Sequence, residues 1–499
     1  MKKTIATLIS VAALASFAEP VQIATARIAN AEGITSAATK LGMMSGSPLL
    51  SAMASAKIND LGMFKYFGKA RQGASIAIPI FADCEKASAG KATLQDDFAF
   101  AVLYPIDGKD AFLAAHPGNV ASNGMTFVET PDAGELSKLF LAFSPDGKWV
   151  SASKCSKLAA QSLSLTDRAS KSIKGCVARL EVGKDEMANL TASLDKASAS
   201  ALDLGAKPNV EKNLKVLKMY TNLAVALRIA DAGIEVEGEF AAAEGTEAAK
   251  SGLKALAPNA LAGVDTNAIW AAAYAADCGM GQARGQINAF MSLCTKYGLK
   301  LDWLGFKSTP NSLSFEIDIP ALINYIENEA LASIMTLDKD GFANELNAIT
   351  DASEYTSKNE PFTVSLSIKG FKPKHTPAEI LAKTMPEAAG KPVYNANSST
   401  VYSFAKAVLT QIAAVRPELT EGLAPVLAAV PEDGESGTAS ITWREGNAHH
   451  SLFRISAEDI GKFGAAANAI TAQIMMNAMK NSAQEAAVPD EDDDADNDD

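Results

Sequence analysis

Residues 176–190 read CVARLEVGKDEMANL, an alternating stretch followed by a glycine, two acids and an apolar helical start. Apolar side chains at every second position of its first half predict a β-strand with one buried face. Gly183 breaks this alternation, and Met187 and Leu190 then follow the spacing of a helix. The stretch therefore predicts a strand that passes directly into a helix.

The same order of features returns twice later in the chain. Residues 451–463, SLFRISAEDIGKF, alternate as far as Ile455 and then present an acidic pair and a helical start. Residues 314–326, SFEIDIPALINYI, repeat the order more loosely, with Pro320 at the first helical position, where proline is favoured. The recurrence predicts an α+β fold in which antiparallel sheets and amphipathic helices form two related lobes built from strand-to-helix units.

The acidic pairs Asp185/Glu186 and Glu458/Asp459 allow two interpretations. They could be carboxylates that carry chemistry, or they could stabilise helix starts, where the helix dipole and unpaired N–H groups favour negative charge. The third copy lacks an acidic pair at this point. Its absence there favours the second interpretation.

Other segments alternate with the same period of two. Residues 223–229 and 234–240 flank a glycine-containing turn and predict a β-hairpin. One of its faces carries Glu235, Glu237 and Glu239, which we interpret as a solvent-exposed sheet face rather than a cation site. Further hairpins are predicted to turn at residues 144–147 and 445–447, further strands at 269–276 and 362–368, and amphipathic helices at 249–256, 287–294 and 460–474.

The N-terminus has the pattern of an export signal. Lys2 and Lys3 precede an apolar run, and small residues at Ser16 and Ala18 suit a signal peptidase, so residues 1–18 are predicted to be a signal peptide cleaved after Ala18. No later segment offers the roughly 20 apolar residues of a transmembrane helix. The protein is therefore expected in the periplasm or outside the cell.

The length of 499 residues and the 48% hydrophobic content predict more than one domain. We expect an N-terminal α+β lobe at residues 19–300, a C-terminal α+β lobe at 301–484 and a disordered acidic tail at 485–499. The formal charge is −13, and eight of the last ten residues are acids. A chain with this acidic balance lacks the clustered Lys and Arg that nucleic acid requires as a partner.

Export to an oxidising compartment makes the cysteines candidates for disulfides. Their order in the sequence suggests that Cys155 pairs with Cys176 and Cys278 with Cys294, which leaves Cys84 over. An equally good interpretation is that they are small buried hydrophobic residues. None has the CxxC spacing of a zinc or redox site.

Signatures of catalysis are weak in this chain. The SxxK pattern of penicillin-binding enzymes occurs five times, including at Ser151 and Ser403, but without its companion SDN and KTG motifs. His449 and His450 are adjacent on a predicted strand, so they should point to opposite faces and bind no metal jointly. We therefore predict no catalytic residue, metal ligand or cofactor.

Residues 98–163 carry a resemblance to a known group of proteins. FAFAVLYPIDGKDAFLAA and FLAFSPDGKWVSASKCSKLAA, and later GIEVEGEFAAAEGTEAAKSGLKALAP, resemble the strand-helix and hairpin-helix units of uncharacterised secreted proteins of planctomycete, verrucomicrobial and lentisphaeral bacteria. That family has a domain of unknown function, and the resemblance implies no catalytic residues.

These observations favour an exported, non-catalytic protein that acts as a binding or envelope-associated structural component, with an unknown protein or envelope partner. One alternative is a periplasmic carrier of an apolar or lipid ligand, enclosed by sheets and by the methionine-rich helix at residues 460–479. Another is a serine hydrolase that uses an SxxK serine.

Overall fold

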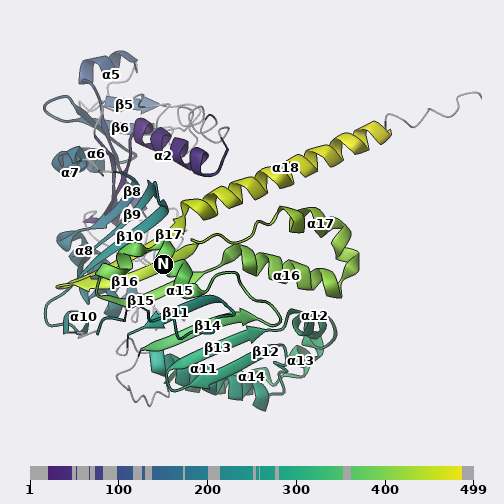
Figure 1. The fold of residues 1–499 in the computed structure, drawn as a ribbon. Helices are drawn as coiled ribbons and strands as arrows, with labels where there is room; N and C mark the ends of the chain where they lie inside the picture. Colours follow the sequence, from purple (N-terminus) through teal and green to yellow (C-terminus); the bar gives the residue numbers. More distant parts are fainter. Residues whose placement is uncertain are drawn as a thin grey trace, which may run out of the picture.

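A computed structural model of the protein is shown in Figure 1. It describes residues 21–47, 52, 67, 74–82, 98–115, 126–129, 138–171, 173, 175–200, 214–250, 254–257, 259–275, 280–351 and 361–485. The predicted signal peptide with its cleavage site at Ala18, the last 14 residues of the acidic tail, and both Cys84 and Cys278 lie outside these residues.

The strands form a single 17-stranded sheet. They are β1 (Val21–Ile28), β2 (Ile76–Ala82), β3 (Phe98–Phe100), β4 (Val102–Pro105), β5 (Thr126–Glu129), β6 (Lys138–Phe143), β7 (Trp149–Ser153), β8 (Cys176–Val182), β9 (Tyr220–Ala230), β10 (Gly233–Ala242), β11 (Ala268–Tyr274), β12 (Leu304–Thr309), β13 (Ser312–Ile317), β14 (Phe362–Ile368), β15 (Val393–Ser399), β16 (Thr438–Glu445) and β17 (Ala448–Ser456).

The helices lie between these strands. They are α2 (Ala31–Met44), α5 (Lys109–Ala115), α6 (Ser156–Ser162), α7 (Thr166–Ser170), α8 (Lys184–Ser200), α10 (Glu247–Lys250), α11 (Met280–Lys296), α12 (Ile319–Asn328), α13 (Ala330–Thr336), α14 (Lys339–Asp351), α15 (Pro377–Thr384), α16 (Val401–Val415), α17 (Thr420–Ala429) and α18 (Ala457–Glu485), with 3-10 helices η4 (Leu163–Leu165), η6 (Pro386–Gly390) and η7 (Pro417–Leu419).

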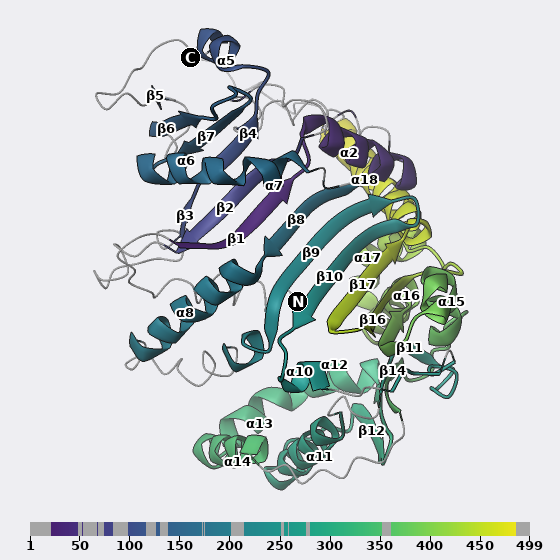
Figure 2. The same ribbon diagram turned by 90° about the vertical axis from the view of Figure 1, so that its left-hand side faces the viewer.

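Neighbouring strands follow the order β5-β6-β7-β4-β2-β1-β8-β9-β10-β17-β16-β15-β11-β14-β13-β12, and β3 pairs with the far end of β2. All described pairs are antiparallel except β13 with β14. The curved sheet and its central strands are visible in Figure 2. This architecture confirms the predicted α+β class with mainly antiparallel pairing.

The strand-to-helix junctions are confirmed at all three predicted places. β8 passes into α8, β13 into α12 and β17 into α18. The two acidic pairs lie in the first turns of α8 and α18, as the helix-start interpretation requires. At the third junction the Asp318 side chain caps α12 by accepting from the N–H of Ala321, so an acid one residue before the helix replaces the pair.

The predicted hairpins are also present, as β6–β7, β9–β10 and β16–β17. The predicted helix at 249–256 is wrong at its end, since residues 254–257 are not helical; α10 covers its first residues as far as Lys250, and residues 251–253 lie outside the described residues. There the backbone N–H of Leu256 donates to the carbonyl of Val393 on β15, and the Leu256 side chain joins the core. A contact with a distant strand thus overrides the local helical spacing.

The sheet does not divide at residue 300, where the boundary between two lobes was predicted. β10 pairs along its length with β17, which comes from the other half of the sequence, and β11 pairs with β14 and β15. The hairpin β9–β10 lies between the two strands that end in acidic junctions, β8 on one side and β17 on the other. The centre of the sheet is therefore built from both halves of the chain.

The two faces of this central region differ in chemistry. On one face, Leu180, Leu223 and Val225 pack with Met187 and Leu190 of α8 in an apolar cluster. The opposite face carries charged side chains. Among the described helices none is long and apolar enough to cross a membrane.

Candidate functional site

Three cross-strand rows define the charged face of the central strands. One row runs Thr25–Glu181–Ala224–Glu239–His450, the next Arg27–Arg179–Ala226–Glu237–Leu452, and the third Arg228–Glu235–Arg454. Directly paired residues of antiparallel strands share a face, so these side chains all lie on the same side of the sheet. The rows draw on β1, β8, β9, β10 and β17.

A cavity of 280 Å³, here called the central hollow, opens on this face. Its floor includes Ala224 and Ala226 of β9, whose small side chains leave room between the longer side chains of the neighbouring strands. Its lining residues are Arg179, Ala224, Ala226, Glu235, Glu237, Gly238, Glu239, Glu387, Lys391, Trp443, His450, Ser451, Leu452 and Arg454. The hollow therefore lies over the strands where the two halves of the chain meet.

Arg454 is the most closely bound charge in the hollow. It is 8% exposed and forms an ion pair of 2.7 Å with Glu235, which is 7% exposed, and another of 2.6 Å with Glu387. Its Nη1 also donates to the carbonyl oxygen of Thr384. Burial alone would lower the pKa of Arg454, but the hydrogen bonds to Glu387 and Glu235 outweigh it and raise that pKa.

The glutamates of β10 have three different environments. Glu235 is buried against Arg454, Glu237 forms a 2.9 Å ion pair with Arg228, and Glu239 is exposed. The prediction of a uniformly solvent-exposed glutamate face is therefore wrong for Glu235. Arg454 comes from a strand more than two hundred residues away, so the spacing of the glutamates carried no sign of it.

An aromatic stack forms one wall of the hollow. The ring of His450 stacks on Trp443 with centroids 5.1 Å apart, and the Lys391 ammonium lies 3.9 Å from the centroid of the Trp443 ring. His449 points to the other face, as predicted, where its Nε2 lies 3.1 Å from the carbonyl oxygen of Ala248. The two histidines therefore belong to separate environments.

A second charged cluster adjoins the hollow through Arg179. Glu181 pairs with Arg179 at 2.7 Å, Arg168 at 3.0 Å and Arg27 at 3.6 Å. Burial alone would raise the pKa of Glu181, but these guanidinium groups, Arg168 foremost, hold it below its usual value. Arg27 has a lowered pKa because burial outweighs its attraction to Glu181. Arg168 also joins this cluster to Glu186, at 2.7 Å.

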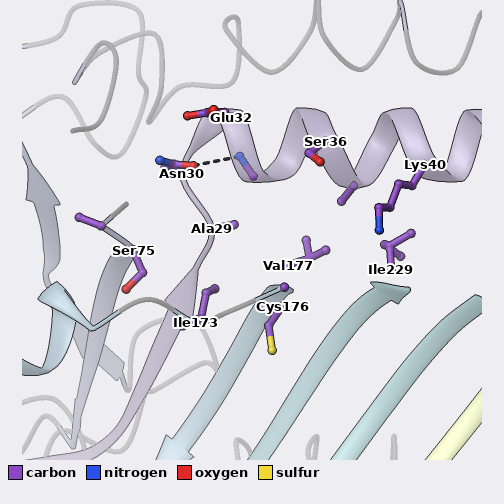
Figure 3. Close-up of a pocket in the computed structure, with 14 residues that line it drawn as sticks. Ala29, Asn30, Glu32, Ser36, Lys40, Ser75, Ile173, Cys176, Val177 and Ile229 are labelled. Atoms are coloured by element: carbon purple, nitrogen blue, oxygen red, sulfur yellow. Dashed lines mark hydrogen bonds between the residues drawn. The ribbon is translucent and has the colours of Figure 1, made fainter. Parts of the chain in front are cut away.

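Figure 3 shows a separate cavity of 350 Å³ beside the start of α2. Asn30 caps the helix here by accepting from the N–H of Gly33. Lys40, further along the same helix, also lines the cavity. Cys176 also lines it, but its sulfur points away from α2 and accepts from Nε of Arg228 at 3.3 Å. The thiol therefore bonds to the charged face of the sheet.

The expected disulfide between Cys155 and Cys176 is absent. Cys155 is exposed before α6, whereas Cys176 is buried and bonded to Arg228. Sequence proximity suggested this pair, but the position of Cys155 before α6 and that of Cys176 on β8 place the two residues in different surroundings. Cys294 is buried on α11, and because its expected partner Cys278 is outside the described residues, that pairing stays a prediction.

The two alternative functions depended on residues that the structure now locates. Ser151 is fully buried on β7, and its hydroxyl has no hydrogen-bond partner among the described residues, so it forms no hydrogen bond with Lys154. Ser403 lies on α16. Met475, Met476 and Met479 are exposed on the far part of α18, so these methionines do not enclose a cavity.

A third cavity, of 770 Å³, is an open groove between α11 and the sheet-edge strand β12. Like the other two, it is lined by polar as well as apolar side chains, among them Met291, Thr295 and Phe306. No group of three His, Cys, Asp or Glu side chains suited to a metal ion occurs within the described part of the chain.

No protein-family model matches this chain, and no curated protein or solved structure matches it at a significant level. The resemblance to secreted proteins of planctomycete, verrucomicrobial and lentisphaeral bacteria therefore stays a prediction.

Proposed function

We propose that the protein is an exported, non-catalytic binding component of the cell envelope that contacts its ligand at the central hollow. The observation that carries this proposal is that the charges around the hollow are paired with one another. Arg454 lies between Glu235 and Glu387, and Glu237 pairs with Arg228. Such fixed, mutually neutralised groups suit recognition of polar atoms better than proton transfer, which needs a group poised to exchange its proton.

The size of the hollow limits what it can hold. Its 280 Å³ lies near the lower end of ligand sites, which begin at roughly 300 Å³. A small polar molecule, or one or two side chains of a partner protein, would fill it. Glu239 and Lys391 supply charges of opposite sign for such a ligand.

The export part of the proposal rests on the first 18 residues. It is tested by the intact mass of the protein recovered from the periplasmic fraction, which should correspond to a chain that starts at Glu19. A chain that keeps its first 18 residues and stays in the cytoplasm would contradict export.

The binding part is tested by native purification followed by mass spectrometry of whatever stays bound. We expect a polar small molecule or a protein partner, and we expect Ala224→Leu, which fills the floor of the hollow, to abolish its retention. Ala465→Leu, on an exposed position of α18, is the matched control and should retain it. Equal retention by all three proteins would remove the hollow as the site, and a co-purifying lipid would favour the carrier function instead.

A further inference from the structure

Three methionines are exposed together on the last helix. Met475 is 62% exposed, Met476 49% and Met479 73%, although methionine is usually a buried residue. They lie on the part of α18 that extends away from the sheet, which Figure 1 shows in yellow. Neither the fold nor the proposed ligand site requires a thioether here.

The spacing of these residues brings them to one patch of the helix. Met479 follows Met475 by four positions and Met476 by three, and both separations place side chains next to each other with Cβ atoms about 5–6 Å apart. Long side chains on a helix lean towards its N-terminus, so Met479 leans over the turn that carries the other two. Met475 and Met476 are consecutive and point about 100° apart around the helix, so it is Met479 that lies next to both, and the flexible side chains of the other two have to bend towards it to share one ion.

The soft donors at this patch are all thioethers. From Phe463 to Met479 the sequence contains no charged residue and no His or Cys, so the hard donors within this span of α18 are limited to neutral amide and hydroxyl oxygen atoms. Thioether sulfur is a soft, neutral ligand, and among biological cations it selects Cu(I). The soft donors of the patch are thus those of a Cu(I) site, with no carboxylate, imidazole or thiolate from this span to compete.

We propose that Met475, Met476 and Met479 bind one Cu(I) ion through their three sulfur atoms. The sequence that follows supports binding of a cation, because eight of the last ten residues are acids and raise the local concentration of positive ions. Binding involves no change in oxidation state, so Cu(I) has to be supplied as such. This site is separate from the central hollow, and each could exist without the other.

The test uses the full mature chain with Cys155→Ser, which removes an exposed thiol that would also bind Cu(I). Cu(I) kept reduced by ascorbate without oxygen is offered in competition with the chromophoric chelator bathocuproine disulfonate. The variant Met475→Leu/Met476→Leu/Met479→Leu keeps the apolar volume and the helix propensity but removes the sulfur atoms. In competition with the chelator, we expect the variant to bind one equivalent of Cu(I) less than the parent. Any Cu(I) that the variant still binds in place of that equivalent should be held at least about tenfold more weakly.

Met43→Leu is the matched control, since Met43 is 70% exposed but lies on α2. It should bind as the parent does. Native mass spectrometry with Ag(I), a redox-stable substitute for Cu(I), should give the same difference of one ion, and circular dichroism checks that each variant is folded. Equal stoichiometry and affinity for the parent and the triple variant, or no withdrawal of Cu(I) from the chelator by the parent, would overturn the proposal.

Discussion

The two acidic junctions, β8 to α8 and β17 to α18, use the same local design in different surroundings. In both, the second acid of the pair is at the third helical position and is buried, as Glu186 and Asp459. Glu186 lies beside Arg168 and accepts from Gln22, Thr25 and the N–H of Gly183. Asp459 has two other carboxyl groups as neighbours.

The difference appears in the ionisation of Asp459. Burial, followed by the charges of Asp433 and Glu458, raises the pKa of Asp459 to about 7. Burial alone would raise the pKa of the neighbouring Glu458. The backbone N–H and the hydroxyl of Ser436 both donate to its carboxylate, and Lys462 lies near, so the pKa of Glu458 is lowered instead. The position of an acid in the first helical turn is thus a local property of the sequence, whereas the charge state of that acid depends on what the rest of the fold places around it.

The largest expected effect comes from removing the cation of the first junction. Arg168→Met leaves the buried Glu186 and the half-buried Glu181 with part of their countercharge gone, and removal of one partner of a buried ion pair typically costs about 3–5 kcal/mol. Urea unfolding should show this loss at pH 7. Lys218→Ala, which breaks an exposed ion pair with Asp195, should change the free energy of unfolding by less than about 1 kcal/mol.

If instead Arg168→Met and Lys218→Ala gave equal losses, the buried cluster would contribute no more than a surface pair. The contrast between the two junctions would then have no energetic basis.

At the second junction, removal of the charge of Asp459 should stabilise the protein. Asp459 has a pKa of about 7 in the folded protein and an ordinary value of 3.8. Its protonated form therefore contributes fully to the free energy of unfolding below pH 3.8, and this contribution is lost as the pH rises through 7. Asp459→Asn should therefore increase the free energy of unfolding at pH 8 by about 2–4 kcal/mol, since each pH unit of separation is worth about 1.4 kcal/mol. Near pH 4 the two proteins should differ little.

The measurement is the difference in the free energy of unfolding between the parent protein and Asp459→Asn from pH 4 to 8. A difference that stays constant over this range would show that Asp459 ionises normally.

A smaller effect is expected from the capping hydroxyl of the second junction. Ser456 Oγ accepts from the backbone N–H of Asp459 at 3.1 Å. Ser456→Ala should lower the free energy of unfolding by about 1 kcal/mol, the usual cost of losing a helix N-cap. Ser436→Ala, which removes one donor to Glu458 at the same junction but no cap, is the comparison, and an equal loss there would mean that capping is not the cause.

The smallest effect is expected at the open charge of the central hollow. Glu239 is exposed, so Glu239→Gln should change the free energy of unfolding by no more than about 0.5 kcal/mol. The same variant tests ligand retention without loss of folding. A large destabilisation would show that Glu239 takes part in the ion-pair network in the way that Glu235 does.

The sequence by itself determined the features that depend on near neighbours. Alternation predicted the β9–β10 hairpin, the glycine and proline positions predicted the turns, and the acids at 185–186 and 458–459 predicted helix starts, because strand faces and helix caps are set within a few residues. Opposite faces for His449 and His450 followed from the same rule.

The tertiary structure decided whatever depends on distant residues. It placed Arg454 against Glu235, paired Leu256 with β15 in place of a helical turn, and set Cys176 beside Arg228 rather than beside Cys155. It also gave Glu186 a cation and Asp459 two acids as neighbours. Pairing of strands from the two halves of the chain creates these contacts, and no local spacing in the sequence records which strand will lie next to which.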